Sequence, residues 1–166
     1  MINKTLLAFG ATLLALPAHA ENVPINGLVQ SKCTIVTETT GVYGNPTNTK
    51  LSTLASEGGV LPIMRYDVVS GDNYKARIST PTSFSSSPTL SDVVNWTGST
   101  SVSEVSVAGM SAYDTNKVVF NNVTEFDLTL AGSTWFASQS TANYGFNKSL
   151  PAGNYNATVL AECIAL

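Results

Sequence analysis

The chain has 166 residues, of which 43% are hydrophobic and only 11% are charged, and its formal net charge is −3 at pH 7. This length suits one domain with a core of its own. The few, mostly acidic charges form no basic stripe, so we expect no nucleic-acid partner and no attraction to anionic membrane surfaces.

Residues 1–20 have the pattern of a secretory signal peptide. Lys4 precedes an apolar run over residues 5–16, and Ala18 and Ala20 frame a small-x-small cleavage site. The run is too short to span a bilayer, and no later stretch is long and apolar enough to do so. We therefore expect export and no membrane insertion.

The signal peptide contains the only histidine, His19. Without histidine, the mature chain has no Ser-His-Asp triad, no Cys-His pair and no histidine metal site. Glu125 and Asp127 share one strand face, but their alternation with apolar residues explains them as a solvated face. We expect no enzyme, no catalytic residue, no metal and no cofactor.

The mature sequence follows the two-residue period of β-strands. In residues 124–130, Phe126, Leu128 and Leu130 alternate with polar residues. Residues 49–56 allow a short helix without strong caps. Glycine, asparagine and proline turn signals separate the strand candidates, which predicts an all-β fold, an antiparallel sandwich or barrel. The candidates are residues 28–37, 60–70, 74–80, 93–97, 102–107, 117–121, 124–130, 134–138 and 155–164.

Cys33 and Cys163 are the only cysteines, one near each end of the mature chain. Because export favours oxidation and two cysteines allow one internal pairing, we expect a Cys33–Cys163 disulfide. Closing so long a loop stabilises a fold by about 4–5 kcal/mol in the chain-entropy model. Two free thiols or an intermolecular bond are the alternatives.

Both ends of the mature chain resemble those of pilin subunits assembled by the chaperone–usher pathway. Near the start, Val23, Ile25, Gly27 and Val29 alternate ahead of the first cysteine. Near the end, a glycine stands fourteenth from the carboxyl terminus and an alternating strand follows it. The residues of this second match are Gly153, Tyr155, Ala157, Val159 and Ala161.

This resemblance implies an immunoglobulin-like antiparallel β-sandwich over residues 33–166 that lacks one strand. Residues 21–32 would form a donor-strand extension that completes the sheet of a neighbouring pilin subunit. Val23, Ile25 and Val29 would be buried there, worth roughly 5–8 kcal/mol before ordering costs. Gly27 would pass where the groove is shallow.

The resemblance also implies partners and a location. The strand that follows Gly153 would form one wall of the groove and contact a periplasmic chaperone, and an outer-membrane usher would export the polymer. The chain would then be exported through the periplasm to a cell-surface fimbrium. A disulfide between the two walls would either close one end of the groove or mean that no open groove exists there.

Two departures leave other interpretations open. Ala165 stands where these pilins usually have an aromatic residue, and the second cysteine comes unusually late. A divergent branch or a spore-coat-U-like secreted protein fits these features, and residues 23–29 could instead be an edge strand of a self-complete sandwich. A carbohydrate-binding adhesin or tip subunit, which binds host or surface glycans, is a further alternative. Its sugar-stacking candidates are Trp96, Trp135, Tyr113 and Tyr144.

Overall fold

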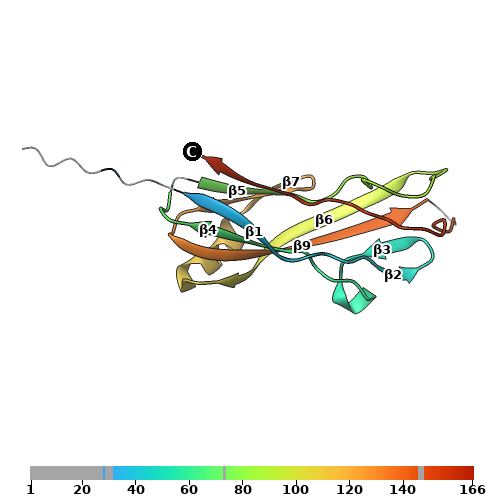
Figure 1. Cartoon of the computed structure of the whole chain (residues 1–166), viewed down its shortest axis with the longest axis horizontal. Helices are drawn as coiled ribbons and strands as arrows, with labels where there is room; N and C mark the ends of the chain where they lie inside the picture. Colours follow the sequence, from blue (N-terminus) through green and yellow to red (C-terminus); the bar gives the residue numbers. More distant parts are fainter. Residues whose placement is uncertain (1–27, 29–31, 73, 146–147) are drawn as a thin grey trace, which may run out of the picture.

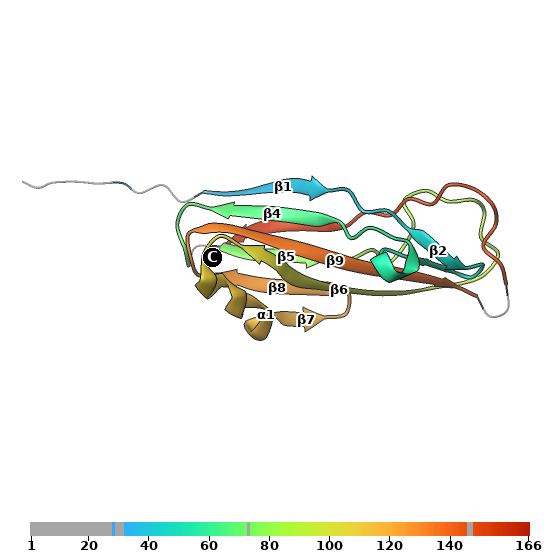
Figure 2. The same cartoon turned by 90° about the horizontal axis from the view of Figure 1, so that it is seen from below.

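The computed structural model of the chain describes residue 28 and residues 32–72, 74–145 and 148–166. These residues form two antiparallel β-sheets that face each other across a shared core (Figures 1 and 2). The prediction of an all-β, sandwich-like fold is therefore confirmed. The expected signal peptide lies outside the described residues.

The first sheet has six strands and is organised around the long strand β9. Its path runs β1 (Cys33–Thr39), β4 (Ile63–Val68), β9 (Gly132–Tyr144), β3 (Lys50–Ser52) and β2 (Gly44–Thr47). On its other side β9 pairs with β6 (Val94–Val105). β1 is consequently an edge strand of this sheet.

The second sheet has four strands in the order β10 (Leu160–Ala165), β5 (Tyr74–Ser79), β8 (Val123–Leu128) and β7 (Val118–Phe120). Its two edges are thus β10 and β7. The helical segments among the described residues are short: two 3₁₀ turns at Ala55–Glu57 and Ala108–Ala112, and α1 at Tyr113–Asn116. The helix allowed over residues 49–56 is instead strand β3 followed by the first of these turns.

Aromatic side chains from both sheets meet in the core. Tyr66 and Phe136 of the first sheet are fully buried and pack edge to face, with ring centroids 5.3 Å apart. The ring centroid of Phe126, in the second sheet, lies 4.4 Å from that of Phe136. Phe126 and Leu128 are buried while Glu125 and Asp127 are not, as expected. Leu130, expected on the same face, lies beyond the end of β8 and is exposed, so the alternation holds only as far as Leu128.

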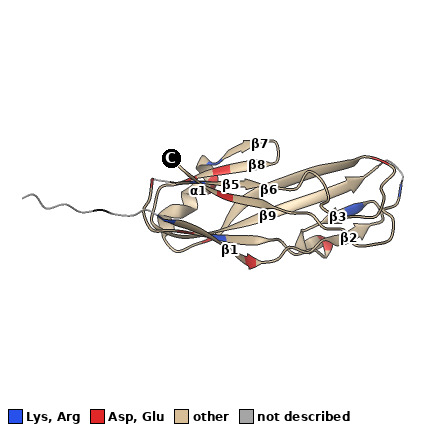
Figure 3. Ribbon diagram, turned by 45° about the horizontal axis from the view of Figure 1, so that its top comes forward, with Lys and Arg blue, Asp and Glu red and all other residues tan. Residues whose placement is uncertain are grey.

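Midway along β6 and β9, hydroxyl side chains replace apolar ones in the interior. Thr100 and Ser138 are almost completely buried and their hydroxyl oxygens lie 2.6 Å apart. Because buried polar groups cost little when they are hydrogen-bonded, such pairs continue the core without apolar side chains. The charged positions on the outside are few and of mixed sign (Figure 3).

Candidate functional site

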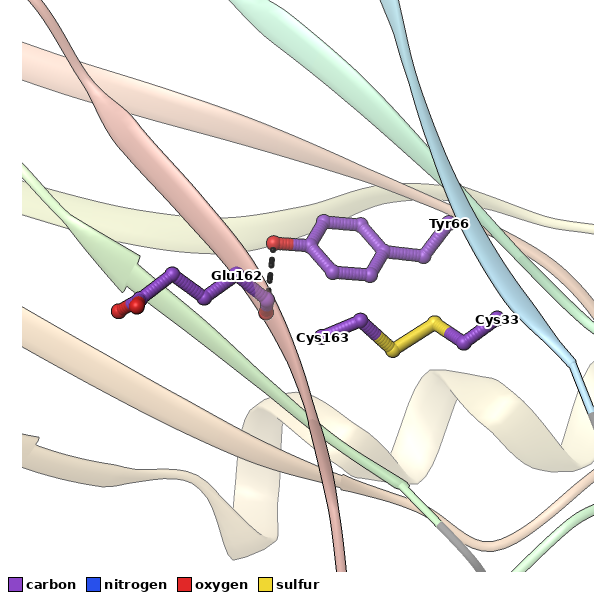
Figure 4. The surroundings of a disulfide bond; sticks show 4 residues. All are labelled: Cys33, Tyr66, Glu162 and Cys163. Carbon is purple, nitrogen blue, oxygen red and sulfur yellow. Dashed lines mark hydrogen bonds between the residues drawn. A yellow bond between two sulfur atoms is a disulfide. The ribbon is translucent and has the colours of Figure 1, made fainter.

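A disulfide joins the first strand of one sheet to the last strand of the other. The Cα atoms of Cys33 in β1 and Cys163 in β10 are 6.4 Å apart, and the predicted pairing is confirmed (Figure 4). Beside it, the hydroxyl of Tyr66 donates a hydrogen bond to the backbone oxygen of Glu162. Burial raises the pKa of this phenol well above its usual value, so the hydroxyl stays protonated and can donate this hydrogen bond.

The two bridged strands are edges of their sheets. In the described part of the chain, β1 pairs only with β4 and β10 pairs only with β5. Beyond the disulfide, β1 and the chain leading into β10 border a groove of about 800 Å³. Ile35 and Ala161, each two residues from a bridged cysteine, line this groove, so the disulfide lies beside one end of it.

The floor and walls of the groove change character along its length. Near the disulfide the lining is apolar, with Ile35, Met64 and Val159. At the far end Tyr43 and Ser140 line it, and their hydroxyl oxygens lie 2.9 Å apart. Burial raises the pKa of Tyr43, which keeps that hydroxyl neutral. Val42 and Leu51 also line the groove, so its far part mixes apolar and hydroxyl-bearing side chains.

The carboxyl-terminal wall consists of the residues that the sequence marked out. All of the following line the groove: Gly153, Tyr155, Ala157, Val159 and Ala161. The residues between them are exposed and also line the groove, so burial alternates from Tyr155 onward but contact with the groove does not. Regular strand pairing, however, begins only at Leu160, and the expected strand over residues 155–164 is wrong at its start. The backbone of most of this wall has no strand neighbour in the described residues.

One contact with the loop before β6 holds the wall in place. Ser85 donates its backbone N–H to the oxygen of Asn156, and Asn156 donates its own N–H to Ser86, both at 2.8 Å. The ring of Tyr155 packs against Phe84, with centroids 5.0 Å apart. The wall is thus fixed at one point and by the disulfide, with an unpaired stretch between.

Gly153 begins the wall in a conformation that favours glycine. Its φ is +151°, and a Cβ atom there would lie 2.5 Å from Cγ of Pro88. A side chain would therefore clash as well as strain the backbone. The need for glycine at this position is local and independent of any partner.

The expected donor residues Val23, Ile25, Gly27 and Val29 lie outside the described residues. Leu28, which is described, is 85% exposed. The described chain enters β1 at the disulfide end of the groove.

The other candidate residues are engaged elsewhere. Glu125 pairs with Lys75 and Arg77, and these hydrogen bonds hold the pKa of its carboxyl below the usual range. Asp127 also approaches Lys75, at 3.7 Å. Together these side chains form a charged ladder across β5 and β8 of the second sheet.

The four sugar-stacking candidates are dispersed. Tyr113 and Tyr144 are buried, Trp96 is half-buried against Phe84, and Trp135 lies beneath the guanidinium of Arg65. They form no shared exposed surface. Within the described ranges there is no group of three metal-ligating side chains, and no helix there is long and apolar enough to cross a bilayer.

No protein-family model matches this chain, and no curated protein or solved structure is significantly similar to it.

Sequence reasoning missed the far half of the groove. Tyr43, Thr53 and Ser140 line it, and they come from three separate segments of the first sheet and its loops. None belongs to a motif, and serine and threonine are common throughout the chain. Only the pairing of β3 with β9 brings Thr53 and Ser140 together, and the sequence carried no signal for β3.

Proposed function

We propose that this chain is a structural subunit of a surface fimbria assembled by donor-strand complementation. Residues 21–32 of one subunit occupy the groove of the next, between β1 and residues 153–161. The sandwich is then an immunoglobulin-like domain that lacks one strand. A periplasmic chaperone covers the groove until the usher admits the donor, and the chain performs no catalysis in this role.

The groove between two edge strands of opposite sheets is the observation that carries this proposal. Unpaired backbone groups on an edge strand invite another strand, and natural proteins usually cover or block such edges. Here β1 and the chain before β10 leave a gap with an apolar floor between them. An added strand would pair with the edges and bury its inward side chains, which is β-strand addition.

The chemistry of the groove suggests the direction of the donor. Its lining is apolar near the disulfide, whereas hydroxyl groups such as those of Tyr43 and Ser140 join apolar side chains towards the other end. In the donor segment, Val23 and Ile25 come first, and Ser31 follows on the same face. Placing the apolar residues Val23 and Ile25 against the apolar end of the groove puts Val23 near the disulfide. The donor then runs parallel to β1 and antiparallel to β10.

The test changes one donor residue on each face of the segment. Ile25→Asp would bury an unpaired carboxylate and should abolish polymer, because a buried charge is expensive. Asn26→Asp introduces the same group on the opposite face and should leave polymer intact. Electron microscopy of the cell surface and unboiled gel electrophoresis of extracts measure the polymer.

Two results would contradict the proposal. Polymer that forms normally with Ile25→Asp would show that residues 21–32 are not the donor strand. Unfolding of an isolated, chaperone-free monomer by Ile25→Asp alone would identify the segment as a strand of its own domain, and the protein would then be a self-complete sandwich.

A further inference from the structure

A second sheet edge, far from the groove, carries apolar side chains without cover. β7 is the outermost strand of the second sheet and lies at the rim of the sandwich (Figures 1 and 2). Val118, Val119 and Phe120 are 59%, 57% and 73% exposed. Alternate residues of a strand face opposite ways, so β7 is exposed on both faces.

The exposed apolar surface continues onto the neighbouring strand. Val118 and Phe120 border a shallow hollow of about 330 Å³ together with Val123 of β8. Its charged border, Arg77 and Glu125, is already joined by a hydrogen bond of 2.7 Å. The hollow therefore offers apolar contact and little free charge to a partner.

β7 is only three residues long, which limits how much edge it offers, but within that length it has no charged side chain, no proline and no bulge to protect the edge. Its register with β8 is regular from Val118 to Phe120. Lys117 precedes it, but this side chain turns back to Asp114 and to the backbone oxygen of Thr100. In the described part of the chain, the outer edge of β7 has no strand partner.

We propose that β7 pairs antiparallel with β7 of a second copy of this chain in a neighbouring fimbria, so that fibres associate side by side. This inference rests on the proposed function. A two-fold axis at Val119 places Val118 opposite the partner's Phe120, which makes apolar cross-strand pairs. Lys117 then lies opposite the partner's Asn121, and no like charges meet.

The size of the surface explains why the partner belongs to another fibre. Three side chains and a shallow hollow fall far short of the about 800 Å² that each partner buries in a stable interface. Free subunits should therefore remain unpaired through β7. Along two parallel fibres the same contact repeats at every subunit, and the summed binding becomes strong because each further contact is intramolecular.

The first test replaces an exposed valine on β7 and one elsewhere. Val119→Lys should leave fibres intact and abolish their bundling in electron micrographs. Val69→Lys is the matched control, since Val69 is 63% exposed and lies in the turn after β4. Bundling that persists with Val119→Lys, or that Val69→Lys abolishes equally, would overturn the inference.

The second test asks whether the two copies meet at the two-fold axis. Residues opposite each other in an antiparallel pair have Cα atoms about 4.5–5.5 Å apart, within disulfide range. Val119→Cys should give oxidised dimers between fibres, and Val69→Cys should give none. Equal cross-linking by both variants, or none by Val119→Cys in bundled fibres, argues against β7 pairing.

Electron microscopy of wild-type cells distinguishes failure of the β7 contact from failure of the proposed function. Fibres that remain single at all concentrations would overturn the β7 contact and leave donor-strand assembly standing. Absence of any polymer from wild-type cells would overturn both. Bundles that disappear with Val119→Lys while fibre number stays constant would support both.

Discussion

The hydroxyl of Tyr66 in β4 reaches across the sandwich and donates a 3.3 Å hydrogen bond to the backbone oxygen of Glu162 in β10. It lies beside the Cys33–Cys163 disulfide, so one covalent link and one polar link join the two sheets at the same end. These links hold β10 in position where the groove begins.

Tyr66→Phe should lower the free energy of unfolding by about 0.5–1.5 kcal/mol, the usual net worth of such a hydrogen bond. The folded protein raises the pKa of this phenol above 10.0. The Tyr66 side chain therefore contributes its full stabilisation below that pH. This stabilisation is lost as pH rises further, because the phenol then ionises in the unfolded chain but not in the folded one. Urea unfolding at pH 7 and above pH 10 should show a steeper alkaline loss for wild type than for Tyr66→Phe. An identical loss in both proteins would contradict this.

Replacing both Cys33 and Cys163 by serine should cost about 4–5 kcal/mol of stability, since the bond closes a loop with a sequence separation of 130. Denaturant unfolding of the variant and of wild type, each with and without reductant, measures the effect. Reductant should destabilise only the wild type. Two alkylatable thiols in properly exported protein would show that the bond does not form.

Glu125→Gln should flatten the loss of stability in acid. Hydrogen bonds from Lys75 and Arg77 lower the pKa of the Glu125 carboxyl below 4.5 in the folded protein. The stabilisation is thus present above that pH and disappears as pH falls through the lower, folded pKa. Thermal unfolding between pH 2 and pH 7 tests this. Asp127→Asn is the control, because that side chain is 66% exposed, and an equal effect from it would argue against Glu125 as the main contributor.

Gly153→Ala should destabilise the protein by about 1–3 kcal/mol through its positive φ and should further disturb the wall through the clash with Pro88. Gly58→Ala separates the two causes. Gly58 also has a positive φ, of +78°, but a Cβ atom there would meet nothing within 4 Å. Calorimetry should therefore show the smaller change for Gly58→Ala. A larger loss of stability for Gly58→Ala would mean that Pro88 moves aside and that its contact with the added methyl group costs little.

Thr37→Trp should block strand addition without unfolding the subunit. Thr37 lines the groove yet is exposed, so a larger side chain there intrudes on the groove and not on the core. Val36→Trp places the same side chain at the adjacent exposed position, which does not line the groove. Polymer yield on unboiled gels should fall for Thr37→Trp alone. Equal yields from both variants would contradict a role for this groove.

The sequence predicted the sandwich best where apolar residues alternate. The segment containing Phe126 and Leu128 became β8 nearly as expected, because burial on one face leaves a two-residue pattern. β9 extends to Tyr144, well beyond the predicted end at residue 138. Its continuation buries Ser140 and Thr141, whose hydroxyl groups lie against those of Tyr43 and Ser52, partners that only the folded chain provides.

The candidate site was predictable in outline and not in detail. Two cysteines leave one internal pairing, and that pairing is present. Residues 153–161 border the groove, but the positions that the terminal motif singled out do so together with the residues between them. The start of β10 was not predictable, because alternation continues through residues that line the groove without a strand neighbour. Strands β2 and β3 are only four and three residues long and gave no periodic signal.

The position of the disulfide has a mechanical consequence. Cys33 opens β1 and Cys163 is the fourth residue from the carboxyl end, so the covalent loop encloses nearly the whole sandwich. Tension applied between the two ends of the chain passes from one cysteine to the other through the sulfur atoms. As long as that bond is intact, such a pull cannot draw out the strands between them and can extend the chain only outside residues 33–163.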